Sequence, residues 1–162
     1  TSFTSAITTF VGQNLGAEEF DRAKKGARFG ILCSLLIAEG IGVITYVFSP
    51  VFIGAFCDSQ AAIAFGVDKA HICALFFCLL AATHCLSAVL RGAGRAMVPM
   101  VVMLSVWCVL RVSILWIAVP ITQSINTVNW VYPITWSIST VVLLIYYRKS
   151  DWLHSFQREK AK

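Results

Sequence analysis

The chain alternates long apolar stretches with short charged ones. No Asp, Glu, Lys or Arg occurs in residues 72–90 or 112–147, and residues 30–57 contain a single charged residue, Glu39. Uncharged stretches of about 18 residues or more are long enough to cross the hydrocarbon core of a bilayer as helices. The pattern therefore predicts an all-α fold, a polytopic membrane helix bundle.

The boundaries of the apolar stretches predict four full transmembrane helices. We expect these spans at residues 29–49, 69–90, 97–119 and 130–147. Pro50 is expected to end the first span, because proline lacks the amide hydrogen that a helix interior needs. Pro99 is expected in the first turn of the third span, where that hydrogen has no partner in any case. Trp152 is expected as an aromatic anchor at the membrane surface, just beyond the fourth span.

Residues 1–16 read as the last part of a fifth membrane helix. At 1.5 Å per residue they extend about 24 Å, which is short of a full crossing. A natural amino terminus there would leave an ammonium group inside the bilayer, which is costly. We therefore expect the chain to be the carboxy-terminal piece of a longer protein. In this scheme residues 1–150 form the membrane part and residues 151–162 a cytoplasmic basic tail.

The basic residues cluster in two of the connections between membrane segments and in the tail after the last span. The chain has 13 Lys and Arg against 8 Asp and Glu, a net charge of +5. Eleven of the 13 lie in the three clusters, which are Arg22, Lys24, Lys25 and Arg28; Arg91 and Arg95; and Arg148, Lys149, Arg158, Lys160 and Lys162. Two crossings separate consecutive clusters, so all three fall on one side of the membrane. The positive-inside rule then places that side, with the carboxy terminus, in the cytosol. The membrane that we expect is the plasma (inner) membrane.

Other function classes find little support in the sequence. A nucleic-acid reader would gather its basic residues with aromatics on one folded face, so the partner we expect is the lipid bilayer and not nucleic acid. The motifs HExxH, GxSxG and Walker A do not occur. Gly92 and Gly94 follow no predicted strand and read as a turn, not a phosphate cradle. The three histidines have no metal-ligand spacing, so we expect no enzyme, no metal site and no cofactor.

Two charged residues fall inside the predicted spans. Glu39 lies near the middle of the first span and Arg111 near the middle of the third. Each costs about 2.5–3.5 kcal/mol on insertion scales, so each is expected to face protein or water instead of lipid. Glu39 is a candidate site for a proton or another cation; its structural alternative is a partner for a donor on a neighbouring helix, such as Arg111. Arg111 itself has a structural reading too, in which its side chain snorkels toward the membrane surface or donates to backbone carbonyls.

Aromatic residues add two further open alternatives. His84 lies mid-span and either relays protons near neutral pH or packs as a hydrogen-bonded core residue. Trp107, Trp116 and Trp136 either line a pocket for aromatic cations or face lipid and other helices.

Two short motifs and their spacing resemble a known transporter family. The sequence GQNLGA at residues 12–17 closes the first helix, and LRGAGR at residues 90–95 follows about one helical hairpin after it. Their helix-end and turn residues are Gly12, Gln13, Gly16, Arg91, Gly92, Gly94 and Pro99. With Arg111 midway along the next helix, this order is similar to the carboxy-terminal lobe of multidrug and toxic compound extrusion (MATE) transporters.

The resemblance implies a specific place in a larger molecule. Residues 1–16 would be the end of helix eight, and the four spans would be helices nine to twelve. MATE transporters have two six-helix lobes around a central cavity and export amphipathic organic cations in exchange for protons or sodium ions. The implied partners are thus the missing amino-terminal lobe and a small-molecule substrate, with a coupling ion in place of a cofactor. The fragment alone is not expected to transport.

Two departures and two alternatives accompany the resemblance. Some MATE members carry an acidic residue on the tenth helix, where this chain offers only His84 and Thr83. In addition, Glu18 follows Gly16 and Ala17 where many members have another small residue. One alternative is a related flippase of lipid-linked oligosaccharides, which would need more cationic residues in the cavity. The other is a non-transporting membrane scaffold subunit, which the mid-span charges fit poorly.

Overall fold

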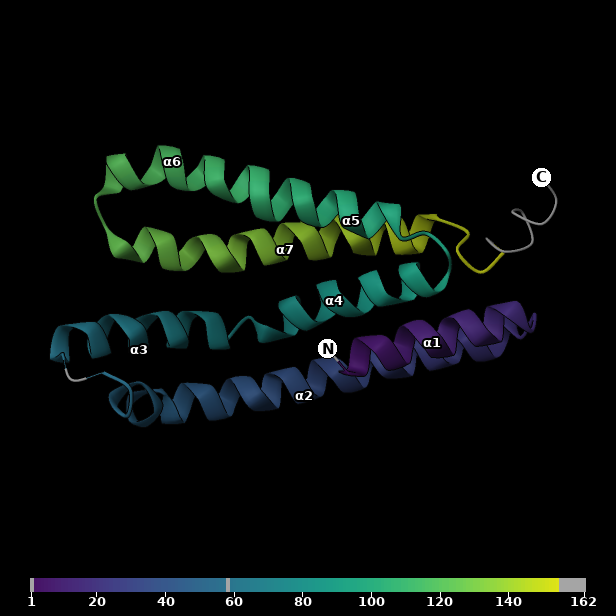
Figure 1. Cartoon of the computed structure of the whole chain (residues 1–162), viewed down its shortest axis with the longest axis horizontal. Helices are drawn as coiled ribbons and strands as arrows, with labels where there is room; N and C mark the ends of the chain where they lie inside the picture. The colour runs from purple at the N-terminus through teal and green to yellow at the C-terminus, as the bar shows by residue number, and fades with distance from the viewer. Residues whose placement is uncertain (1, 58, 155–162) are drawn as a thin grey trace.

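The computed structural model describes residues 2–57 and 59–154, all of whose regular structure is helical (Figure 1). The elements are α1 (Ser2–Gly16), α2 (Phe20–Gly54), α3 (Gln60–Ala74), α4 (Phe77–Gly92), α5 (Met97–Met103), the π-helical segment η1 (Leu104–Leu110), α6 (Arg111–Thr122) and α7 (Ile125–Lys149). The predicted all-α class is confirmed. Arg158, Lys160 and Lys162 of the predicted basic tail lie outside the described residues.

The helices form an antiparallel bundle of crossings. Three stretches, α2, α5 to α6, and α7, are long and apolar enough to span a membrane, and α3 with α4 makes a fourth, bent span. α4 lies at the centre and contacts α1, α2 and α7. The prediction of four spans plus the end of a fifth agrees with this arrangement (Figure 1).

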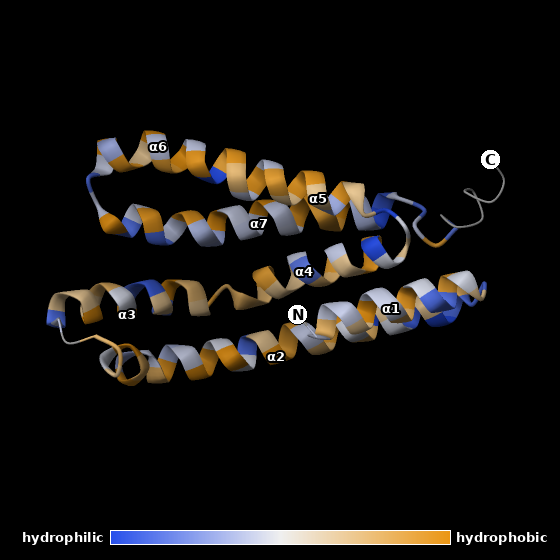
Figure 2. Ribbon diagram, in the orientation of Figure 1, coloured by the Kyte–Doolittle hydropathy of each residue, from blue (hydrophilic) through white to orange (hydrophobic). Residues whose placement is uncertain are grey.

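The outer surfaces of the bundle are apolar, as Figure 2 shows by colour. Leu36 and Val51 on α2 and Ile121 on α6 are each at least two-thirds exposed, and Trp116 is 81% exposed. Water does not tolerate apolar surface on this scale, whereas the hydrocarbon core of a bilayer does. These surfaces identify an integral membrane protein.

The described basic clusters lie at one end of the bundle, which we call the basic end. There α1 meets α2, α4 meets α5, and α7 ends, and Figure 2 shows hydrophilic colour at these points. The opposite end holds the α2–α3 and α6–α7 connections (Figure 1). The structure thus brings the clusters together on one side, as their spacing predicted.

The prediction that Pro50 ends the first span is wrong, since α2 continues through it to Gly54. A proline inside a helix leaves the carbonyl four residues earlier without its amide partner. Here that carbonyl belongs to Tyr46, and it accepts from Ser49 Oγ at 3.3 Å. His71 Nε2 of α3 lies 3.0 Å from the same oxygen, a distance at which the Nε2–H tautomer donates a hydrogen bond. Side chains therefore replace the missing backbone bond.

The second predicted span, residues 69–90, begins earlier and is broken. Helix begins at Gln60, stops at Ala74, and resumes at Phe77 with a bend of 54°. Neither proline nor glycine occurs at the break. The break lies opposite Gly42 of α2, where a Cβ atom would come 2.5 Å from the Ala74 carbonyl oxygen. The close approach of two backbones, which no local signal predicts, accompanies the bend.

The last two spans are longer than predicted. Helix runs without a gap from Met97 to Thr122, and it includes Pro120 where we expected the span to end. α7 begins at Ile125 instead of residue 130, so only residues 123–124 connect it to α6. Pro99 lies in the first turn of α5, as predicted.

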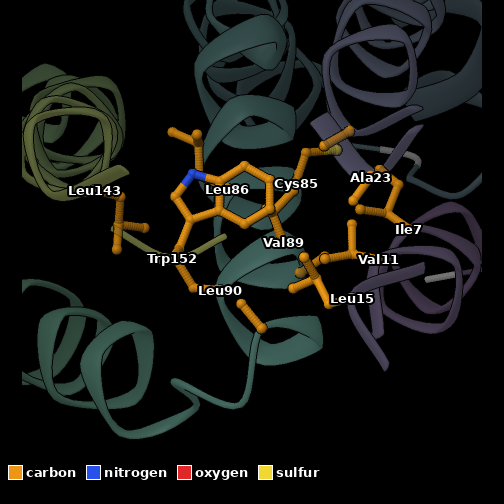
Figure 3. Packing of buried hydrophobic residues seen from close by; sticks show 13 residues of the cluster. Ile7, Val11, Leu15, Ala23, Cys85, Leu86, Val89, Leu90, Leu143 and Trp152 are labelled. Atoms are coloured by element: carbon orange, nitrogen blue, oxygen red, sulfur yellow. The ribbon is translucent and has the colours of Figure 1, made fainter. Parts of the chain in front are cut away.

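A buried apolar cluster surrounds the basic end of α4 (Figure 3). Val11 and Leu15 of α1 lie on one side of α4, and Leu143 of α7 and Trp152 lie on the other. Trp152 is only 4% exposed, so its expected role as an interfacial anchor is wrong. The segment after α7 turns back and packs its indole onto α4.

The motifs at residues 12–17 and 90–95 meet in space, although Gly12 and Gly92 are 80 positions apart in the sequence. A Cβ atom on Gly12 would lie 3.3 Å from the Gly92 carbonyl oxygen, and one on Gly92 would lie 2.6 Å from the Thr8 carbonyl oxygen. Thr8 Oγ1 also donates to the Ala88 carbonyl at 3.1 Å. Small residues that let helix backbones approach closely are typical of membrane helix interfaces. Gly12 and Gly92 thus serve the contact between α1 and α4.

Both motifs also end their helices with the same capping hydrogen bonds. After α4, Arg95 N–H donates to Leu90 O at 2.8 Å and Gly94 N–H to Arg91 O at 3.0 Å, with Gly94 at φ 77°. After α1, the equivalent bonds start at Glu19 and Glu18, and the left-handed residue is Glu18 at φ 62°. Both ends are Schellman motifs, in which glycine is the favoured left-handed residue.

Replacing Glu18 with glycine is therefore expected to stabilise the protein. A left-handed conformation costs an L-residue about 1–2 kcal/mol, and part of that cost is offset by the greater freedom of glycine in the unfolded chain. We expect Glu18→Gly to raise the free energy of unfolding by about 0.5–1 kcal/mol, measured as a higher thermal unfolding midpoint in detergent. Glu19→Gly is the matched control, since Glu19 has φ −85° and gains nothing. Equal midpoints for the two variants would contradict the capping assignment.

Candidate functional site

Buried hydroxyl groups join α4 to α7 in the interior of the bundle. Thr83 Oγ1 lies 2.8 Å from Thr140 Oγ1 and 3.3 Å from Ser139 Oγ. Thr140 Oγ1 also donates to the Leu79 carbonyl at 2.9 Å, and Ser87 Oγ donates to the Thr83 carbonyl at 2.7 Å. Every one of these hydroxyls has a partner, as buried polar groups require. The interface is therefore polar at its centre although apolar residues surround it.

Arg111 extends this hydroxyl interface toward the opposite end of the bundle. Its Nη2 and Nε atoms donate to Thr135 Oγ1 at 2.6 and 3.2 Å. Its guanidinium carbon lies 4.7 Å from the ring centroid of Tyr132 and 5.4 Å from that of Trp107. Two aromatic rings and a hydroxyl thus hold the charge by hydrogen bonding and cation–π attraction. These contacts are to side chains, so the expectation that Arg111 bonds backbone carbonyls is not what the structure shows.

A π-helical segment places Arg111 and Trp107 together. η1 covers Leu104–Leu110, and α-helix resumes at Arg111. Trp107 Nε1 donates to Ser139 Oγ at 3.2 Å, so Trp107 and Arg111 both contact α7. Short π-helical segments inside membrane-length helices occur frequently at functional sites. We call Thr83, Ser87, Trp107, Arg111, Thr135, Ser139 and Thr140 the polar network.

His84 lies beside this network and beside a cavity. Its ring meets the Trp107 ring edge-on at a centroid distance of 5.6 Å. The half-buried side chain also lines an open, largely apolar cavity of about 310 Å³ between the start of α1, α2 and α4. Through Trp107, the structure connects two of the predicted site residues, His84 and Arg111.

Glu39 of α2 lies apart from the polar network, where α2 faces the break between α3 and α4. Its side chain lines a cavity of about 130 Å³ at the α3–α4 break. Its Oε2 atom is buried and has no hydrogen-bond partner among the described residues. Arg111 makes its contacts with α7 and η1, so the pairing of Glu39 with Arg111 that we considered is not formed.

Sequence reasoning missed the α7 part of the network. Thr135 and Ser139 stand four residues apart in an otherwise apolar span, which is the spacing of one helix face. That signal was present, but only the folded structure shows which face meets Arg111. Of the three candidate tryptophans, Trp107 is in the network, Trp136 is buried and contacts Phe77 of α4, and Trp116 faces outward.

The fold and this site define a polytopic helical membrane protein with a charged group and hydroxyl groups in its interior. The family model described as MatE matches residues 1–117, from α1 into α6. The chain belongs to the MatE family. The resemblance that its motifs predicted is thereby confirmed.

Two curated relatives agree with this assignment. The chain is 27% identical over 145 residues to the probable multidrug resistance protein YoeA of Bacillus subtilis (strain 168). This alignment covers 88% of this chain and 31% of that protein. The chain is also 30% identical over 103 residues to the probable multidrug resistance protein NorM of Thermotoga maritima. That alignment covers 63% of this chain and 22% of the relative. The chain thus spans about a third or less of the length of these relatives.

Proposed function

We propose that the chain forms part of the carboxy-terminal lobe of a secondary active antiporter. The whole protein would export drugs or amphipathic organic cations in exchange for protons or sodium ions. The observation that carries the proposal is the polar network around Arg111, inside a chain of the MatE family. A charge at mid-membrane is costly to retain and by default marks a substrate or ion pathway. The names of both relatives, as multidrug resistance proteins, support export.

The proposal includes an orientation and a missing partner. We place the basic end, with the carboxy terminus, in the cytosol, and the bundle in the plasma (inner) membrane. An amino-terminal lobe would complete a central cavity against this one, so the described bundle alone is not expected to transport. Glu39, His84 and Arg111 are the candidate residues for the coupling ion or the substrate.

A transport assay on the full gene product tests the proposal. In proteoliposomes with an imposed proton or sodium gradient, we expect ethidium to accumulate against its own concentration gradient. The accumulated ethidium should leak back when an ionophore dissipates the ion gradient. Arg111→Gln removes the cation–π contacts and the charge-assisted bond to Thr135, interactions worth about 1.5–3 kcal/mol for a charged donor. We therefore expect the export rate to fall by about tenfold or more.

Arg22→Gln is the matched control, because Arg22 is exposed at the start of α2 and lies outside the network. Its export rate should equal that of the wild type. Ethidium movement that needs no ion gradient would contradict antiport. Equal export rates in Arg111→Gln and the wild type would show that the polar network is not part of the substrate or ion pathway.

One observation favours the flippase alternative. Lys69 Nζ lies 4.7 Å from the Tyr132 ring centroid, so Lys69 and Arg111 both face one ring, and two cations suit a pyrophosphate better than one. The same proteoliposomes distinguish the two functions. Translocation of a fluorescent lipid-linked oligosaccharide without ethidium export would favour the flippase, and neither activity would favour the scaffold.

A further inference from the structure

Arg91 is an exposed cation in the last turn of α4, at the basic end of the bundle. No hydrogen bond or ion pair joins its side chain to another described residue, whereas Arg95 in the following turn donates to Tyr146 Oη at 2.9 Å. A guanidinium group carries five N–H donors and a permanent charge. Arg91 therefore has its full binding capacity available for an anionic group.

Two grooves meet at the Arg91 side chain, one on the α1 side of α4 and one on the α5 side. α4 contacts both of these helices and lies between them (Figure 1). The polar groove, of about 290 Å³, is lined by Arg91 and by four hydroxyl side chains of α1, which are Thr4, Ser5, Thr8 and Thr9. The apolar groove, of about 490 Å³, is lined by Arg91 and by Ala96, Met100, Met103, Leu104, Trp107 and Cys108. The cation thus stands between a hydroxyl-lined surface and an apolar one, which is the pattern that an amphipathic anion needs.

The apolar groove extends from the membrane surface to the middle of the membrane. Ala96 precedes α5 at the basic end, and Cys108 lies three positions before Arg111. The 12 positions between Ala96 and Cys108 correspond to about 18 Å of helix. One leaflet is about half of a hydrocarbon core that is roughly 30 Å thick. The groove therefore has the depth of one leaflet, with the cation at its outer end and methionine and tryptophan along its length.

We propose that Arg91 and the apolar groove bind an anionic phospholipid, with the lipid phosphate on the Arg91 guanidinium and one acyl chain in the groove. Arginine pairs with phosphate through two parallel hydrogen bonds, and basic pockets between membrane helices bind anionic headgroups. The polar groove faces the rest of the headgroup. A choline headgroup would bring a positive charge close to Arg91 and Arg95, whereas the glycerol headgroup of phosphatidylglycerol brings only hydroxyls. This site does not depend on the proposed antiport.

Thermal unfolding of the purified full gene product in a neutral detergent tests the site. Phosphatidylglycerol and phosphatidylcholine with the same acyl chains are added at equal mole fractions, and glycerol phosphate is added at the same concentration in a third arm. We expect phosphatidylglycerol to raise the unfolding midpoint more than phosphatidylcholine does, because a ligand that binds only the folded state stabilises it. Glycerol phosphate has the anionic group without the acyl chain, so it should leave the midpoint unchanged.

Two pairs of variants separate the headgroup contact from the acyl-chain contact. Arg91→Gln should lower the apparent affinity for phosphatidylglycerol by about tenfold or more, since it removes a charge-assisted bond to the phosphate. Arg22→Gln is its matched control, because Arg22 is exposed and lines neither groove. Met100→Trp fills the apolar groove without changing any charge, and it should also weaken the response. Met97→Trp is the control for that variant, since Met97 is 66% exposed and does not line the groove.

The second pair keeps the test decisive if Arg91→Gln folds poorly. Equal midpoint shifts with the two phospholipids, or equal losses in Arg91→Gln and Arg22→Gln, would mean only a general attraction of anions to the basic end and would overturn the site. An equal response to glycerol phosphate would overturn the lipid as its ligand. A wild type that responds to no phospholipid would mean that another part of the full protein covers the groove, which also overturns the site. A response that requires Arg91 in a protein that exports no ethidium keeps the site and overturns the exporter.

Discussion

Replacing Trp152 with alanine is expected to cost about 3–5 kcal/mol of the free energy of unfolding, the usual range for removing a buried tryptophan. The indole is 4% exposed and stacks on Tyr147 at a centroid distance of 5.3 Å. It also belongs to the apolar cluster on α4 that includes Leu143 (Figure 3). The alanine variant would leave a cavity at the basic end, where water from the membrane surface reaches the core.

The measurement is the unfolding midpoint of the full gene product in detergent, with two comparison variants. Trp152→Phe keeps an aromatic ring and should lose only part of the stability. Trp116→Ala removes the same side chain from a position that is 81% exposed in the described bundle, and it should change the midpoint little. A Trp152→Ala variant that unfolds with the wild type would show that the segment after α7 does not pack on α4.

The number of crossings and their sidedness followed from local features of the sequence. Apolar length decides whether a helix can span a bilayer, and the basic clusters decide which ends lie together; both are properties of short stretches. The structure agrees with these predictions, and the family match agrees with the motif at residues 12–17 and the turn at residues 90–95.

The errors came from contacts between distant residues. Pro50 remains inside α2 because His71, from another helix, lies at the carbonyl that proline leaves free. Trp152 has the same local sequence context as an interfacial anchor, and only the fold back onto α4 makes it a core residue. The bend between α3 and α4 contains neither proline nor glycine, and its close contact is with Gly42, more than 30 residues earlier.

The candidate site was predictable in its parts but not in its connections. Glu39, His84 and Arg111 stand out because charged and titratable groups are rare inside membrane spans. Which helix faces each of them depends on the rotation of α7 and on the π-helical segment before Arg111. For this reason the sequence suggested a Glu39–Arg111 pair, whereas the structure directs the two charges to different neighbours.

The contact between the two motifs gives the second large effect. We expect Gly92→Ala to destabilise the protein by about 1–3 kcal/mol, the range for overpacking a close interface. A Cβ atom there would lie 2.6 Å from the Thr8 carbonyl oxygen and 3.0 Å from Val11 Cβ. A backbone oxygen cannot rotate away as a side chain can, so α1 and α4 would have to separate. That movement would also stretch the 3.1 Å bond from Thr8 Oγ1 to Ala88 O.

Gly16→Ala is the matched control for this prediction. Gly16 also belongs to one of the two motifs, but a Cβ atom there would meet nothing within 4 Å. Alanine is about 1 kcal/mol better than glycine in a helix interior, so at this helix end Gly16→Ala should be neutral or slightly stabilising. Unfolding midpoints of the two variants in detergent check the contrast. If both variants unfold alike, α1 and α4 do not touch at Gly92, and the spacing of the motifs has another cause. If only Gly92→Ala loses stability, the role of that motif glycine is to join two membrane helices.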